Sequence, residues 1–344
     1  MATLPEPEIL LPVLITFNRA EALRATLEAF SRSAFSHGPF LVLDNASTDH
    51  TAEVVASFQA AWPGLRRVRN RHNIGGPANI LRAVEAADSR YLWVIGDDDR
   101  WFLDDPEELF AVLRAGAADV IRLGWLVQDG HRGRTLGARE LSAREPMLFA
   151  SLSMISATIV RRELFIRHLP SAYTGTGDAY PQLVPLLRAY DQADFSVHTL
   201  ARDLMVHTPS TVPGYFFHDL EWLSCWFRNA RFLSRRRDRV RFLDEIMHYL
   251  TPAARGRSRE NRVIVAKALQ FKGYGVPQGR YLMNLLTYGD GRRLAVALAL
   301  LAYALVPGRL ALWWDDRSRR RRGLPAGQAR EVFARRARER LARL

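Results

Sequence analysis

The stretch Tyr91–Asp99 reads YLWVIGDDD, an uninterrupted apolar run followed by one glycine and three aspartates. A short apolar run bounded by a glycine is typical of a strand that is buried on both of its faces. Strands of this kind belong to parallel sheets that helices cover on both sides. Ligands bind at the carboxyl ends of such strands, so the aspartates stand where a binding site is expected.

The residues before this stretch repeat a strand-then-helix pattern. Apolar runs at 9–16, 40–43 and 65–68 predict strands, and each is followed by apolar residues at helical spacing. Asn18 is a predicted cap for the first helix, and Ser47 or Thr48 for the second. The predicted fold class is α/β, a mostly parallel sheet flanked by helices.

Predictions after Trp101 are coarser. A helix is predicted at 106–115, strands at 119–123 and 154–160, a hairpin at Asp129 and Gly130, and a mainly helical C-terminal region beyond 217. A chain of 344 residues accommodates one large or two modest domains. We divide it into a catalytic domain at 1–205, a helical region at 206–290 and a membrane-associating segment with a basic tail at 291–344.

Cysteine usage and motif content exclude several classes of protein. The single cysteine, Cys225, leaves no intrachain disulfide framework and no cysteine-based metal cluster. No G-x-G-x-x-G follows a predicted strand, which disfavours a dinucleotide-binding dehydrogenase. The first eight residues hold no basic residue ahead of the apolar run, so we expect no signal peptide and a cytoplasmic protein.

Charge is distributed unevenly along the chain. The net charge is +13, yet residues 1–150 hold 16 arginines against 20 acidic residues, and the excess positive charge lies beyond them. Leu294–Val306 carries no charge but falls short of the roughly 20 apolar residues of a membrane span. Trp313, Trp314 and the arginines that follow favour contact with an anionic membrane surface. A buried helix followed by a solvated basic tail is the alternative.

The triple aspartate predicts a cation site. Adjacent carboxylates repel one another, and burying them together is costly unless a cation lies beside them. Mn²⁺ and Mg²⁺ take oxygen ligands and commonly bridge a carboxylate to a phosphate. A solvated acidic turn before the next helix is the alternative.

Other predicted strands also end in polar or permissive residues. These residues are Thr16, Asn18 and Arg19 after the first strand, Asp44, Asn45 and Ser47 after the second, and Asn73 and Gly75 after the third. We expect them to line one pocket with the aspartates.

Four motifs follow one another along the chain: ITFNR (15–19), LDNASTDHT (43–51), NIGG (73–76) and YLWVIGDDD (91–99). Motifs in this order resemble the family 2 glycosyltransferases, which have the GT-A fold. The last is most similar to the abequosyltransferase-like branch of O-antigen assembly, and the resemblance covers about residues 9–165. It implies transfer of a sugar from a nucleotide-sugar donor.

The resemblance also implies roles for single residues. Asp44 would hydrogen-bond the nucleotide base, and the remaining strand-end residues would line the nucleotide-sugar pocket. Asp97 and Asp99 would form the Asp-x-Asp metal pair, with Asp99 as the first ligand and Asp97 or Asp98 facing the ribose. Many family members carry Ala-Arg-Asn where this chain has Pro77–Asn79, so that arginine is missing here.

An inverting member needs a base from the acceptor side, and Asp178 is our first candidate, ahead of Asp191 and Asp194. It lies in a glycine-rich loop just before the helix predicted at Pro181, and an ordinary helix N-cap is the alternative. His207 and His218 are considered as further metal or phosphate contacts, with a structural role favoured for both.

The predicted function is a metal-dependent, inverting glycosyltransferase at the inner face of the plasma membrane, with a lipid-linked or cell-surface polysaccharide acceptor. A sugar-nucleotidyltransferase is a second interpretation, although Thr16–Ala20 lacks the glycine-rich loop it needs. A non-enzymatic polyanion binder of RNA or membrane is the third. The acidic first half makes nucleic acid an unexpected partner.

Overall fold

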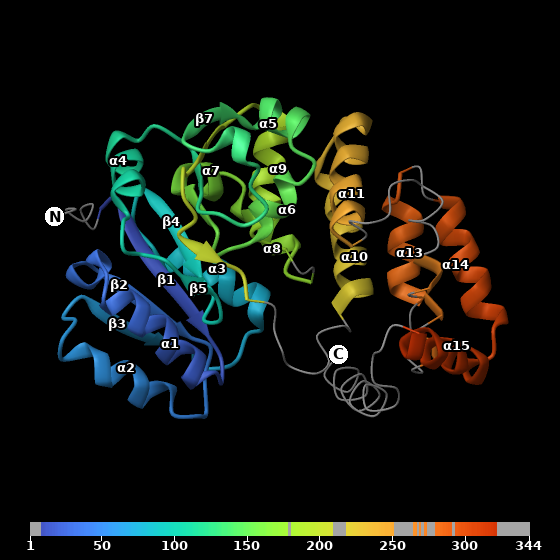
Figure 1. Cartoon of the computed structure of the whole chain (residues 1–344), viewed down its shortest axis with the longest axis horizontal. Coiled ribbons are helices and arrows are strands. Elements are labelled where there is room, and N and C mark those ends of the chain that lie inside the picture. Colours follow the sequence, from blue (N-terminus) through green and yellow to red (C-terminus); the bar gives the residue numbers. More distant parts are fainter. Residues whose placement is uncertain are drawn as a thin grey trace. The chain divides into compact units, whose positions relative to one another are not determined.

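The computed structural model describes residues 8–177, 180–208, 218–250, 264–266, 268–269, 272–273, 279–290 and 293–321. The chain divides into two compact units, residues 1–209 and 210–344, which are shown in Figure 1. The finer division of the second unit at residue 290 stays a prediction.

The described part of the first unit contains an eight-stranded sheet with the order β3-β2-β1-β4-β8-β6-β9-β7. The strands β7 and β8 run antiparallel to their neighbours, and the other pairs are parallel. The predicted mostly parallel α/β sheet is therefore confirmed. The strands are β1 (Leu10–Thr16), β2 (Phe40–Asp44), β3 (Leu65–Arg69), β4 (Tyr91–Ile95), β6 (Val120–Arg122), β7 (Arg134–Gly137), β8 (Thr158–Arg161) and β9 (Ser196–Thr199).

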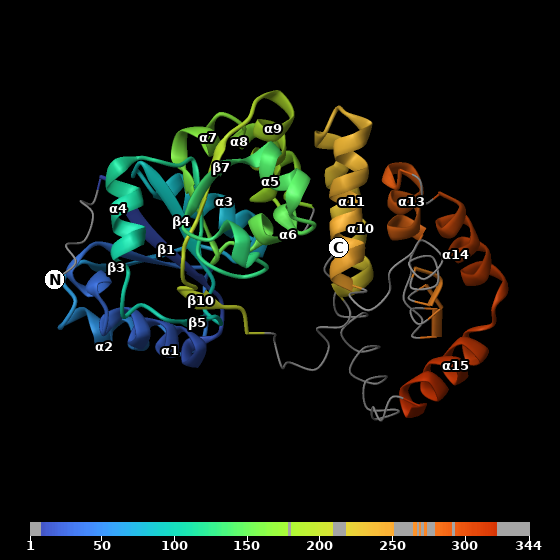
Figure 2. The same cartoon turned by 45° about the horizontal axis from the view of Figure 1, so that its top comes forward.

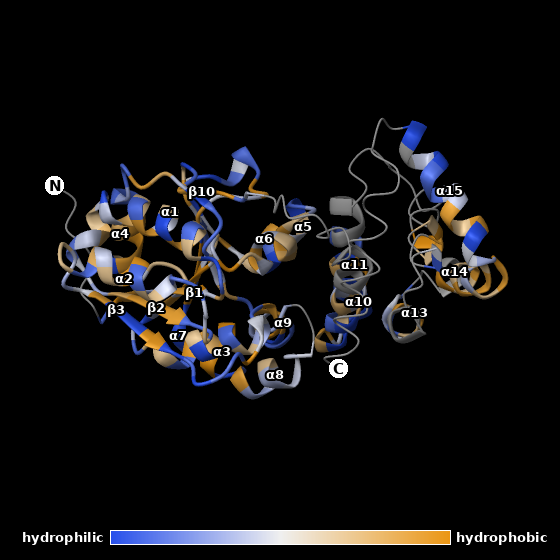
Figure 3. Cartoon of the chain, turned by 90° about the horizontal axis from the view of Figure 1, so that it is seen from below, coloured by the Kyte–Doolittle hydropathy of each residue, from blue (hydrophilic) through white to orange (hydrophobic). Residues whose placement is uncertain are grey.

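Helices cover the sheet on both faces, as Figure 3 shows edge-on. One layer contains α1 (Ala20–Ser31), α2 (Thr51–Gln59) and α4 (Glu107–Ala115). The opposite layer contains α3 (Gly76–Ala86), α7 (Arg162–Ile166), α8 (Leu169–Thr174) and α9 (Leu183–Gln192). The short helices α5 (Ala138–Arg144) and α6 (Leu148–Ser153) and the 3-10 turn η1 (Ala34–His37) complete the unit.

The apolar side chains of β4 pack against both helical layers. Tyr91, Trp93 and Ile95 join a buried cluster with side chains of α1 and α4, and the Trp93 ring lies 5.6 Å from that of Phe30. Leu92 and Val94 point the other way and line a small apolar space with residues of α3 and α9. Alternate residues of one strand are thus buried on opposite faces, as the sequence predicted.

Some local predictions are wrong. Asp129–His131 forms a 3-10 turn, η2, and β7 pairs with the distant β9 rather than closing a hairpin. The strand predicted from residue 154 begins only at Thr158, because residues 154–157 form a turn in which the N–H of Ala157 donates to the carbonyl oxygen of Met154.

The predicted caps are also wrong. Neither Asn18 nor Ser47 nor Thr48 is the N-cap of a helix, since Arg19 and His50 hold those positions. Asp49 serves both helices instead, because its carboxylate accepts hydrogen bonds from the backbone N–H of Ala20 at 3.0 Å and of Thr51 at 3.2 Å.

The second unit is helical where it is described, which confirms the predicted helical C-terminal region. Its helices are α10 (His218–Asn229), α11 (Arg236–Leu250), α13 (Gly279–Tyr288), α14 (Arg293–Leu305) and α15 (Gly308–Arg321), with a 3-10 turn, η4, at Ala230–Phe232. Trp226 stacks on Phe242 with ring centroids 4.4 Å apart. None of the described helices is by itself long and apolar enough for a membrane span; Val296–Leu305 and Gly308–Ser318 meet the criterion as a pair, bent by 115°.

Candidate active site

The predicted site lies where the strand order of the sheet reverses. The chain places β2 and β3 on one side of β1 and β4 on the other. A crevice forms at such a reversal, beyond the carboxyl ends of the strands. Thr16 ends β1 and Asp97 follows β4, and the Thr16 hydroxyl donates a hydrogen bond of 2.7 Å to Asp97 Oδ2 across this point.

Arg19 holds two of the three aspartates. Its Nη1 lies 3.0 Å from Asp97 Oδ1, and its Nη2 lies 2.9 Å from Asp98 Oδ2. One guanidinium therefore offsets the repulsion between the two neighbouring carboxylates. From the sequence alone, we expected a metal cation to do this.

Burial dominates the acidity of Asp97. It raises the pKa of Asp97 to about 6, although the charge of Arg19 and the Thr16 hydrogen bond lower it. The carboxylate is only 5% exposed. Desolvation of the negative charge makes this end of the crevice favourable for additional positive charge.

Asp44 is completely buried and already hydrogen-bonded at both oxygens. Its Oδ1 accepts from the backbone N–H of Ser47 at 2.8 Å, and its Oδ2 accepts from Arg67 Nη2 at 2.6 Å. Arg67 lies on β3, next to β2 in the sheet, and was not among the predicted site residues. The role of Asp44 toward a nucleotide base stays a prediction.

Hydrogen bonds of amide and hydroxyl groups connect the loops after β1, β2 and β3. The backbone N–H of Asn18 donates to Ser47 Oγ at 3.0 Å, and Asn45 Nδ2 donates to Asn73 Oδ1 at 2.8 Å. The same Asn73 oxygen accepts from the N–H of Gly75 at 2.9 Å. The structure thus brings together the residues predicted from three separate strand ends.

Two of these loops store backbone strain. Asn18 has a φ of 52° and Ala46 a φ of 67°, a left-handed conformation that costs energy for residues with a Cβ atom. Gly75 adopts a φ of 82° without that cost. Strained non-glycine residues cluster at functional sites, because the surrounding structure holds them in place.

Asp99 contacts His207, for which the sequence favoured a structural role. The two-stranded sheet of β5 (Arg100–Trp101) and β10 (Met205–Val206), visible in Figure 2, pairs Arg100 with Val206. This register brings the next residue, His207, to Asp99, and His207 Nδ1 lies 3.1 Å from Asp99 Oδ1. The hydrogen bond to Asp99 raises the pKa of His207 against the effect of burial.

The second oxygen of Asp99 is the free ligand atom of the site. Asp99 Oδ2 is buried and has no hydrogen-bond partner among the described residues. A buried carboxylate oxygen without a donor is costly, and a divalent cation would satisfy it. Both oxygens of Asp97 are occupied by Arg19 and Thr16, so Asp97 could serve as a ligand only after one of these partners moved.

The residues present fit a cation that is completed by its substrate. The described residues hold no group of three His, Cys, Asp or Glu side chains arranged as a metal site. Mg²⁺ is usually bound by one or two carboxylates together with substrate phosphates. Asp99 and a donor diphosphate match that arrangement.

Asp178, the candidate base, lies outside the described residues. Its role stays a prediction.

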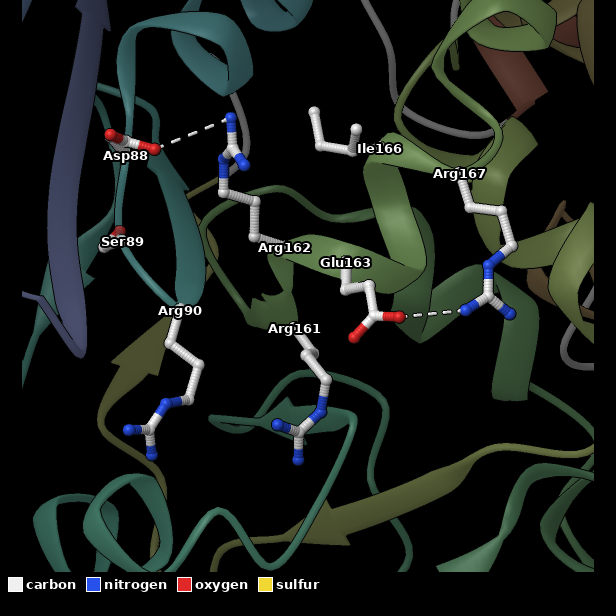
Figure 4. Close-up of a pocket in the computed structure, with 8 residues that line it drawn as sticks. All are labelled: Asp88, Ser89, Arg90, Arg161, Arg162, Glu163, Ile166 and Arg167. Atoms are coloured by element: carbon white, nitrogen blue, oxygen red, sulfur yellow. Dashed lines mark hydrogen bonds and ion pairs between the residues drawn. The ribbon is translucent and has the colours of Figure 1, made fainter.

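An arginine-lined cavity of about 540 Å³ lies at the opposite end of β4 (Figure 4). Residues 88–90, just before β4, form one wall of it, and the predicted donor residues are absent from its lining. Arg167 pairs with Glu163 at 3.0 Å, and Arg161 pairs with Asp119 at 2.9 Å. Both arginines thus pair with carboxylates, and the cavity lies at the opposite end of the strands from the aspartates that follow β4.

Three relatives of known sequence resemble parts of the chain. Abequosyltransferase RfbV of Salmonella typhimurium is 24% identical over 215 residues, which cover 56% of this chain and 64% of RfbV. The putative teichuronic acid biosynthesis glycosyltransferase TuaG of Bacillus subtilis is 23% identical over 33% of this chain and 46% of TuaG. An uncharacterized Mycobacterium tuberculosis protein is 34% identical over 28% of each chain. The chain thus spans less than two thirds of the length of each relative.

Solved structures and a family model match as well. TarS of S. aureus superposes with a TM-score of 0.57 at 14% identity over 91% of both chains. Mannosyltransferase PcManGT from Pyrobaculum calidifontis, solved with GDP-Man and Mn²⁺, superposes with a TM-score of 0.51 at 14% identity over 91% of this chain and 85% of PcManGT. These likenesses show the fold. Residues 13–165, a little under half of the chain, match the model described as Glycosyl transferase family 2. This match agrees with the motif order and with the sheet described above.

Proposed function

We propose that this chain transfers one sugar, with inversion, from a nucleotide-sugar donor to a lipid-linked or cell-surface polysaccharide acceptor. The observation that carries the proposal is that hydrogen bonds link the loops after four strands at one end of the sheet, where one buried oxygen of Asp99 is left without a partner among the described residues. The family match and the glycosyltransferase relatives RfbV and TuaG support it.

The chemistry is a displacement at the anomeric carbon. A bond forms from the acceptor oxygen to this carbon, and the bond from the carbon to the diphosphate oxygen breaks. The nucleoside diphosphate leaves with the bonding electron pair, and the acceptor proton passes to a base. A bound Mn²⁺ or Mg²⁺ would stabilise the charge that develops on the diphosphate.

The residues of the chain position the donor. Asp99 would hold the cation through Oδ2, while His207 fixes the orientation of its carboxylate. Arg19, Asn18 and Thr16 would line the nucleotide pocket, since Arg19 and Thr16 contact Asp97 at the reversal of the strand order and Asn18 lies in the same loop. We propose Asp178 as the base that takes the acceptor proton.

The proposed acceptor and location are supported by two relatives and by the charge of the chain. RfbV is named as an abequosyltransferase, and TuaG is named as a putative teichuronic acid biosynthesis glycosyltransferase. Together with the basic second half of the chain, this favours a lipid-linked or surface glycan acceptor and a peripheral position at the inner face of the plasma membrane.

Calorimetric titration with UDP, GDP, dTDP and CDP, each with and without Mn²⁺, tests the donor site. We expect one nucleotide to bind in a Mn²⁺-dependent manner and Asp99→Asn to abolish this dependence. Asp88→Asn is the matched control, because Asp88 is 99% exposed at the opposite end of β4. Equal Mn²⁺-dependent binding by wild type and Asp99→Asn would exclude the proposed ligand.

Product analysis separates the two enzyme classes. A glycosyltransferase releases a nucleoside diphosphate from its donor, whereas a sugar-nucleotidyltransferase releases pyrophosphate. Pyrophosphate as the product would overturn the proposed function even if nucleotide binding were found.

A further inference from the structure

The helix α14 presents leucines to solvent. Val296 and Ala299 are fully buried and face the rest of the unit. Leu298, Leu301 and Leu305 are 49%, 55% and 76% exposed. Their spacing of three and four residues places them on one stripe of the helix. A helix at a water-facing surface normally has the reverse pattern, with its polar side outward.

The helix α15 also exposes apolar side chains in its first half, and it exposes arginines in its second half. Ala311 and Asp315 are buried, whereas Leu310, Trp313 and Trp314 are 53%, 56% and 39% exposed. One and two turns further along, the exposed side chains are Arg317, Arg320 and Arg321. The exposed stripe is therefore apolar at its start and basic at its end, and the Arg317 guanidinium lies 5.4 Å from the centre of the Trp313 ring.

These six apolar side chains are concentrated in 17 consecutive residues, 298–314. The other large exposed hydrophobic residues are spread over the rest of the described chain, as at Val68, Phe102 and Tyr173. Scattered exposed apolar residues are ordinary, whereas a concentrated group marks an interaction surface. We call the side chains of Leu298, Leu301, Leu305, Leu310, Trp313 and Trp314, with Arg317, Arg320 and Arg321, the α14–α15 surface.

We propose that the α14–α15 surface docks onto a bilayer that contains anionic phospholipid. Its leucines would enter the boundary between headgroups and acyl chains, its tryptophans would lie at the level of the headgroups, and its arginines would contact lipid phosphates. This combination of an apolar stripe, interfacial tryptophans and cations is what an interfacial helix requires. Of the two carboxylates of α15, Asp315 is buried and Asp316 is only partly exposed.

The dimensions favour lying on the membrane over crossing it. The 13 residues of α14 extend roughly 20 Å, less than the roughly 30 Å of a hydrocarbon core. The bend of 115° after α14 directs the chain away from a straight span. Membrane docking by this surface rests on the peripheral location proposed above and names the elements that would provide it. Its test is independent of sugar transfer, because vesicle binding and nucleotide titration are measured separately.

Co-sedimentation of the full-length protein with vesicles tests the proposal. The probes are vesicles of phosphatidylcholine alone and of phosphatidylcholine mixed with phosphatidylglycerol. We expect binding to the mixed vesicles, at least about tenfold weaker binding for Leu305→Gln/Trp313→Ala, and a weaker preference for phosphatidylglycerol in Arg317→Gln/Arg320→Gln/Arg321→Gln. Val68→Gln, which removes an exposed apolar side chain from β3, should bind as wild type does.

Two outcomes would overturn the proposal. If Leu305→Gln/Trp313→Ala binds as wild type does and salt abolishes binding in both, the basic residues act alone and the apolar stripe has no role. If no variant changes sedimentation and the same double variant converts a dimer to a monomer in analytical ultracentrifugation, the surface contacts a second copy of the chain. Circular dichroism of each variant confirms that it is folded.

Discussion

The hydrogen bond between Asp99 and His207 joins residues 108 positions apart and links the Asp99 carboxylate to the strand pair β5–β10. Partners that orient a metal ligand typically change metal affinity 10- to 100-fold when they are removed. We expect His207→Ala to weaken Mn²⁺-dependent nucleotide binding by about tenfold while the choice among nucleotides is unchanged. Titration of Mn²⁺ at saturating nucleotide measures this, with the exposed His37→Ala on η1 as the control.

Asp178 can be tested as the base without knowledge of its placement. Asp178→Asn removes the proton acceptor and keeps the size of the side chain. We expect transfer to fall by about 10²- to 10⁴-fold while Mn²⁺-dependent nucleotide binding stays as in the wild type. Parallel loss of both functions would show that Asp178 supports the fold or the donor instead.

At the scale of elements, the turn before β3 depends on a close backbone approach. A Cβ atom added to Gly64 would collide with the carbonyl oxygen of Gly38, which also accepts a hydrogen bond from the Trp62 indole at 2.9 Å. We expect Gly64→Ala to lower the free energy of unfolding by about 1–3 kcal/mol. Urea denaturation measures the change, and Gly130→Ala, where an added Cβ atom meets nothing within 4 Å, should have little effect.

Asp119 links β8 and β9 and makes their association dependent on pH. Burial raises the pKa of Asp119, but hydrogen bonds from Ser196 and Arg161 outweigh it and the pKa is lowered overall. A lowered pKa contributes stability above the unfolded value of 3.8, and this contribution is lost as the pH falls through the folded value. We therefore expect Asp119→Asn to have a lower Tm than wild type at pH 7 and the difference to shrink below pH 4. A constant difference across that range would contradict this explanation.

At the scale of the whole molecule, the two compact units should separate by function. The residues of the candidate donor site lie within 1–209, and the α14–α15 surface lies within 210–344. We expect the fragment 1–209 to fold, to retain Mn²⁺-dependent nucleotide binding and to lose vesicle binding. Circular dichroism, titration and co-sedimentation of this fragment measure the three properties, and an unfolded fragment would show that the first unit requires the second.

The sequence by itself determined the class of the sheet and indicated the place of the candidate site. Both follow from local patterns: YLWVI is apolar on both faces of one strand, and polar residues end the strands before it. Because parallel strands present their carboxyl ends at one edge of a sheet, these polar residues had to converge. The family motifs assigned them roles, which stay predictions.

The tertiary structure alone decided which side chains and strands contact one another. Arg67 reaches Asp44 because β2 and β3 pair, His207 reaches Asp99 because β5 and β10 pair, and β7 pairs with β9 rather than forming the predicted hairpin. The leucines of α14 were visible in the sequence, but their exposure depends on which stripe the neighbouring helices bury. Contacts between residues far apart in the chain depend on strand pairing and helix packing, which local patterns do not encode.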